Sequence, residues 1–94
     1  MIIRIVKMSF EPSKITDFKA HFETVRDQIK TFDGNCFLEL YQDKDNRSTF
    51  FTYSHWQSIG DLENYRQSDF FKKVWSETKP MFNDKPEAWS LLQQ

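Results

Sequence analysis

The sequence predicts an α+β domain of the ferredoxin-like type, with a four-stranded antiparallel sheet that carries helices on one face. Two observations lead to this prediction. The hydrophobic pattern switches between the period of a strand and that of a helix in the order β-α-β-β-α-β. The length of 94 residues suits one domain, which we place at residues 1–94.

The chain starts with a predicted strand and an amphipathic helix. Residues 2–10 are rich in β-branched and apolar side chains and stop before Glu11-Pro12, as expected of a strand. Ser13 is suitably placed to cap the helix that follows. Apolar side chains then recur at steps of three and four and form one stripe: Ile15, Phe18, Phe22, Val25 and Ile29.

The middle of the chain has the pattern of a β-hairpin. Asp33-Gly34-Asn35 ends the first helix with turn residues. Residues 36–42 and 48–56 are predicted strands, and the polar residues 43–47 form the short link between them. The single cysteine, Cys36, lies in an apolar run, so we expect a buried and unreactive thiol.

Two helical segments and a last strand complete the predicted domain. Ser58 with Asp61 is a helix-start signature, and the helix is expected to run to about residue 66. A second helix is predicted from residue 69 to about residue 79. Pro80 and Pro86 then break the helical pattern, and residues 87–92 form the last strand.

Both faces of the predicted sheet are apolar, although the helices can cover only one of them. The two faces of the strand at residues 48–56 consist of Phe50, Thr52, Ser54 and Trp56 on one side and Phe51, Tyr53 and His55 on the other. A soluble monomer rarely exposes so large an apolar patch. We therefore predict a homodimer in which two copies pack through the open sheet face.

Composition excludes several classes of function. Thirteen basic and fourteen acidic residues give a net charge of -1, whereas nucleic-acid binders usually carry a basic stripe. No apolar run approaches the roughly 20 residues of a membrane span, and the first residues resemble a strand rather than a signal peptide. One cysteine cannot form a disulfide framework or a multi-cysteine metal site. We expect a cytoplasmic protein without nucleic-acid or membrane partners.

Residues 55–71 carry the most specific pattern in the sequence. Trp56 ends a strand, a capped helix begins at once, and its sequence is Leu62-Glu63-Asn64-Tyr65-Arg66-Gln67-Ser68. With the order of the elements, this stretch resembles the antibiotic biosynthesis monooxygenase (ABM) family of dimeric α+β barrels. The resemblance runs from Ile2 to about Leu92. It implies a dimeric α+β barrel with a pocket between sheet and helices, near Trp56.

The resemblance also limits the chemistry. Family members include cofactor-independent oxygenases of aromatic polyketides, quinol oxidases, haem-degrading enzymes, an isomerase of a signalling sugar and proteins without known activity. The histidine that binds haem iron in one branch corresponds here to Trp75, whose indole offers no lone pair to iron. Many members place a histidine on the helix after Trp56, and this chain has Tyr65 there. We expect no cofactor and no metal, since glycine-rich phosphate loops and metal-ligand spacings are also missing.

Two side chains are candidates for catalytic proton transfer, His21 and Tyr65. An imidazole suits a general base near neutral pH. His21 flanks the apolar stripe of the first helix. Its side chain either points into the pocket between sheet and helices or is half-exposed at the surface. The Tyr65 hydroxyl could bind substrate or relay a proton. His55 alternates with Trp56 and is expected at the dimer interface if Trp56 faces the pocket.

Five further residues are expected to form the substrate pocket: Lys7, Phe22, Ser54, Trp56 and Trp75. The rings would stack on a planar ligand or simply fill the core. Lys7 would hold a phenolate or carboxylate, or extend to solvent along its own stem. The resemblance implies a cofactor-independent monooxygenase of a small electron-rich aromatic or quinol-like compound. The alternatives are a non-catalytic dimeric stress-associated or small-molecule-binding protein, and an isomerase of a small oxygenated metabolite.

Overall fold

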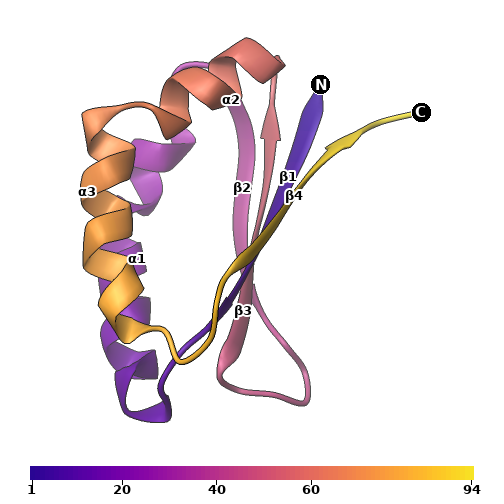
Figure 1. Cartoon of the computed structure of the whole chain (residues 1–94). Helices are drawn as coiled ribbons and strands as arrows, with labels where there is room; N and C mark the ends of the chain where they lie inside the picture. Colours follow the sequence, from indigo (N-terminus) through magenta and orange to yellow (C-terminus); the bar gives the residue numbers. More distant parts are fainter.

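The computed structural model describes all residues, 1–94, and consists of one sheet covered by helices on one face (Figure 1). The elements are β1 (Ile2–Ser9), α1 (Ile15–Lys30), β2 (Asn35–Gln42), β3 (Thr49–Trp56), α2 (Ile59–Arg66), α3 (Asp69–Thr78) and β4 (Glu87–Leu92), with short 3₁₀ turns at Pro12–Lys14 and Lys79–Met81. This arrangement confirms the predicted α+β ferredoxin-like fold with four antiparallel strands.

The sheet has the strand order β2-β3-β1-β4, and every neighbouring pair is antiparallel. Residues that pair directly across two strands point to the same face. Ile2 pairs with Trp56 and Arg4 with Ser54, so these four side chains face the helices. The intervening residues of β1 and β3 face away from the helices and form the open face.

Local sequence explains where two of the helices begin, but not the first one. The Ser58 hydroxyl accepts the Asp61 N–H at 3.1 Å, and the Ser68 hydroxyl accepts the Phe71 N–H at 3.0 Å. The predicted Ser13 cap is wrong. The turn Pro12–Lys14 encloses that serine, and the residue before α1 is Lys14, which makes no side-chain cap.

The core between sheet and helices is built mainly from aromatic rings. Phe10, Phe18, Phe50 and Trp56 are each at most 2% exposed. The rings of Phe10 and Phe18 stack with centroids 4.0 Å apart, and Phe50 meets Phe18 edge-on at 5.3 Å. Large rings fill the interior of a small domain with few residues. The predicted stripe of α1 is confirmed, since Phe18, Phe22, Val25 and Ile29 are buried.

The link between α1 and β2 shows one feature that the sequence suggested and one that it did not. Gly34 has φ +88°, and a side chain there would overlap that of Asp61 in α2. Cys36 is exposed, which contradicts the expected burial. The reason is a register irregularity between Asn35 and Phe37 at the start of the edge strand β2.

Candidate functional site

A cavity of about 300 Å³ lies between the sheet and the three helices. Fourteen of its 22 lining residues are hydrophobic, and its volume is at the lower end of the range for small-molecule sites, about 300–1,000 Å³. Six of the seven residues predicted for the site line it: His21, Phe22, Ser54, Trp56, Tyr65 and Trp75. The structure thus brings together side chains from β3 and from all three helices.

A run of aromatic rings forms one wall of the cavity. Trp56 and Tyr65 stack with centroids 4.8 Å apart and planes 27° apart. Phe71 meets Tyr65 edge-on at 5.1 Å and stacks on Trp75 at 5.9 Å. The Trp56 Nε1–H donates to the Ser54 hydroxyl at 3.0 Å, which fixes the indole. Such a wall suits a flat organic ligand.

Tyr65 is a buried phenol, and its ionisation is disfavoured. Its side chain is 9% exposed, and burial raises the pKa of the hydroxyl far above its ordinary value. The hydroxyl makes no hydrogen bond within the chain, whereas the main-chain carbonyl accepts from the Ser68 hydroxyl at 2.6 Å. A phenol that keeps its proton can donate a hydrogen bond to a ligand, but it cannot act as a base near neutral pH.

Tyr65 is expected to weaken the fold at alkaline pH. A tyrosine in the unfolded chain has a pKa of about 10, and burial raises the pKa of Tyr65 in the folded protein above this value. Its contribution to stability is therefore complete below about pH 10 and is lost as pH rises towards the folded pKa. Urea unfolding between neutral pH and strong alkali should show a smaller loss for Tyr65→Phe than for the wild type. Tyr41→Phe removes an exposed phenol and is the matched control, and parallel losses in all three proteins would contradict the expectation.

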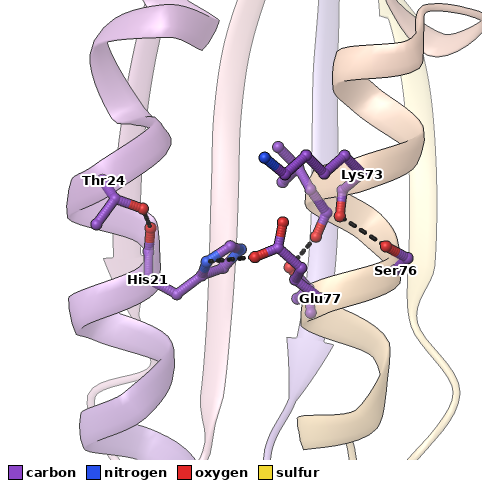
Figure 2. A network of polar contacts seen from close by, with 7 residues as sticks. His21, Thr24, Lys73, Ser76 and Glu77 are labelled. Carbon is purple, nitrogen blue, oxygen red and sulfur yellow. Dashed lines mark hydrogen bonds and ion pairs between the residues drawn. The ribbon is translucent and has the colours of Figure 1, made fainter.

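His21 projects from α1 towards α3, where Glu77 faces it (Figure 2). The distance between His21 Nδ1 and Glu77 Oε2 is 4.0 Å, and the imidazole side chain is 16% exposed. The other ring nitrogen, Nε2, is buried and has no hydrogen-bond partner. A buried polar atom without a partner is unusual in a native fold. In the tautomer whose Nδ1–H faces Glu77, the Nε2 lone pair is free for a ligand.

Lys7 is the one predicted pocket residue that the structure places elsewhere. It pairs with Phe51 of β3 and Glu87 of β4 on the open face, and its Nζ lies 4.0 Å from Glu87 Oε1. The alternation of side chains along β1 explains the error, because it turns Lys7 away from the helices. The cation that β1 supplies to the cavity wall is instead Arg4.

His55 lies on the open face, as expected from its alternation with Trp56. Its ring centroid is 5.2 Å from that of Phe37 and 5.1 Å from that of Tyr53. It takes no part in the cavity wall. Of the two histidines, only His21 lines the cavity.

Sequence reasoning missed the charged residues Arg4, Arg66 and Glu77 at the site. Arg4 and Arg66 line the cavity, and Glu77 faces His21. The alternation of β1 could have revealed Arg4, which shares a face with Val6 and Met8. No sequence signal indicated Glu77, because its position depends on how α1 and α3 pack.

No three His, Cys, Asp or Glu side chains are grouped so that they could hold a metal ion, and none of the helices has the length and apolarity to span a bilayer.

Comparison with known proteins places these features in a wider context. The family described as antibiotic biosynthesis monooxygenase matches residues 1–75. A conserved protein from Methanosarcina mazei Go1 aligns with a TM-score of 0.92 at 20% identity, over 100% of this chain and 94% of its own. A candidate antibiotic biosynthesis monooxygenase from Nitrosomonas europaea aligns with a TM-score of 0.90 at 16% identity, over 99% and 98%.

A Mycobacterium tuberculosis protein has the same arrangement, with a TM-score of 0.90 at 14% identity over 99% of this chain and 94% of its own. The search of curated protein sequences gave no match. At these levels of identity the solved structures establish the fold. The family match over residues 1–75 is a separate observation, and it concerns the relationship of the sequence to a family rather than the fold.

Proposed function

Since the chain belongs to the antibiotic biosynthesis monooxygenase family, we propose that it is a cofactor-independent monooxygenase of a small electron-rich aromatic or quinol-like compound. One observation carries the proposal: a buried, unpartnered imidazole nitrogen of His21 in the wall of an aromatic cavity. Glu77 faces the other nitrogen of the same ring (Figure 2). This is the arrangement that a general base needs.

In the proposed reaction the protein orients and deprotonates the substrate, which itself supplies the electrons. An anthrone would lie against Trp56 and Trp75, and His21 Nε2 would remove a proton from it. The resulting carbanion would transfer electrons to O₂ and form a bond to oxygen. One oxygen atom would become the new carbonyl of the quinone, and the other would leave as water. Tyr65 would donate a hydrogen bond to the substrate oxygen, because it remains protonated.

Oxygen consumption with a panel of hydroquinones and anthrones tests this proposal directly. We expect uptake above the buffer rate, with one O₂ consumed per anthrone converted to its quinone. Tyr65→Phe should lower turnover by about 2- to 10-fold, the usual effect of losing one neutral hydrogen bond. Turnover no faster than in buffer, with Tyr65→Phe identical to wild type, would refute the proposed oxygenase activity.

The second candidate function is that of a dimeric protein that binds a small hydrophobic molecule without converting it. The mainly hydrophobic wall of the cavity favours it. This function requires stoichiometric ligand binding with neither oxygen uptake nor product. An isomerase remains the third candidate, because His21 and Tyr65 line the same cavity. It requires a product of unchanged mass that also forms without oxygen.

The proposal includes a homodimer formed through the open sheet face. The strand β4 is exposed along its whole length, and Trp89 and Leu91 keep 42% and 43% exposure. On the same face, Tyr53 packs edge-on against Phe37 and Tyr41 at centroid distances of 6.0 and 6.5 Å. A second copy placed against this aromatic sheet would bury both apolar surfaces at once.

A further inference from the structure

Two arginines from different elements line the same cavity. Arg4 extends from β1 on the face that meets the helices, and Arg66 lies at the last turn of α2. The structure brings a strand residue and a helix residue of like charge to one wall. Neither arginine has a role in the proposed oxygenation reaction.

The protein supplies few partners for these two guanidinium groups. Arg4 Nη1 donates to the Ser90 hydroxyl at 2.9 Å, and Arg66 Nη1 donates to Glu63 Oε1 at 2.9 Å. Each guanidinium carries five N–H donors, so most of the donors have no partner within the chain. Glu87 also lines the cavity, but its carboxylate oxygen lies 4.0 Å from Lys7 Nζ. Glu63 is therefore the only carboxylate within ion-pair distance of either guanidinium group.

The electrostatics of Arg4 agree with this shortage of anions. Partial burial, and then the positive charge of Arg66, lower the pKa of Arg4 from its ordinary value, while Glu63 opposes the shift. The guanidinium stays protonated at physiological pH. An anion placed beside both arginines would remove part of the unfavourable interaction between them.

We propose that Arg4 and Arg66 form an anion-binding subsite of the cavity, and that the ligand is a flat aromatic molecule carrying a carboxylate. The aromatic wall of Trp56, Tyr65 and Trp75 would hold the rings, and the planar guanidinium groups would hold the carboxylate through paired hydrogen bonds. This inference rests on the proposed function only in placing the ligand in the same cavity.

A comparison of 2-naphthoate with its neutral analogue 2-naphthylmethanol tests the subsite by calorimetric titration. The two probes share the ring system and differ in charge. We expect 2-naphthoate to bind about 10- to 100-fold more tightly at low salt, the range for hydrogen bonds to charged groups. The preference should shrink as salt increases. Equal affinity for the two probes would overturn the proposal.

Variants separate the subsite from a general effect of net charge. Arg4→Gln and Arg66→Gln should each remove most of the preference for 2-naphthoate. Arg47→Gln makes the same chemical change on the exposed link between β2 and β3 and should keep it. Equal weakening by Arg47→Gln would show that net charge alone is responsible.

Thermal unfolding with and without ligand shows both whether a variant is folded and whether it binds the ligand. Without ligand, Arg4→Gln should melt no lower than the wild type, because it removes a partly buried charge. With 2-naphthoate, the wild type should melt higher and Arg4→Gln should not. A rise of equal size in both proteins would contradict the subsite.

The test of the anion-binding subsite does not depend on whether the protein oxygenates a substrate. Selective binding of 2-naphthoate without oxygen uptake from any phenol would support the subsite and remove the oxygenase. Oxygen uptake without any preference for 2-naphthoate would support the oxygenase and remove the subsite.

Discussion

His21→Gln is expected to lower kcat for the best phenolic substrate by about 10²- to 10⁴-fold, the usual contribution of a general base. Glutamine approximates the size of the imidazole, but its amide cannot accept a proton near neutral pH. The Michaelis constant should change little, because the aromatic wall remains intact. Steady-state oxygen uptake over a range of substrate concentrations measures both constants.

Glu77→Gln should lower kcat less than His21→Gln does, and it should also leave the Michaelis constant unchanged. Glu77 faces His21 Nδ1 at 4.0 Å, so in the proposed reaction it would act through that ring, as a positioning residue (Figure 2). Adding Glu77→Gln to His21→Gln should therefore cause no further loss, since residues that act as a unit are not additive.

Glu23→Gln is the matched control for Glu77→Gln. It removes one carboxylate from the exposed side of α1, where Glu23 pairs with Arg26 at 2.8 Å. Its kcat should equal that of the wild type. Two results would refute the role of His21 as a base: retention of kcat in His21→Gln, or additive losses in the double variant.

Tyr53→Asp is expected to dissociate the proposed homodimer. Tyr53 lies on the central strand β3 of the open face, between Phe37 and Tyr41. A carboxylate without a partner in an apolar interface costs about 3 kcal/mol or more, which raises the dimer Kd at least about 100-fold. Light scattering during gel filtration should then give the mass of one chain, 11.4 kDa, instead of twice that value.

Two further variants distinguish disruption of the interface from a simple change of charge. Asn64→Asp adds the same charge on the exposed side of α2 and should remain dimeric. Leu91→Asp places a carboxylate on β4, at another point of the open face, and should dissociate the dimer as Tyr53→Asp does. A wild type of 11.4 kDa at micromolar concentration, or a dimeric Tyr53→Asp, would contradict the proposed interface.

Local sequence patterns predicted most of the fold, because the periods of strands and helices depend on neighbouring residues. They placed β3 up to Trp56, the stripe of α1 and the cap at Ser58. They failed where the backbone departs from a regular element. The Pro12–Lys14 turn encloses Ser13, and the irregular start of β2 exposes Cys36.

For the site, the same patterns identified which side chains share a face. The family resemblance of residues 55–71 predicted Trp56 and Tyr65 as pocket residues, and both line the cavity. Lys7 was misplaced although alternation groups it with Ile3 and Ile5 on the open face. The same rule, applied to β1 without exception, would have selected Arg4.

The sequence by itself determined the order of the elements, the two apolar faces of the sheet and the aromatic character of the cavity wall. These properties follow from residue type and from periods of two and 3.6, which act over a few neighbours. Only the tertiary structure decided that Glu77 of α3 faces His21 of α1 and that Arg4 and Arg66 share one wall. Such contacts join residues far apart in the chain, and the packing of helices on the sheet sets their distances.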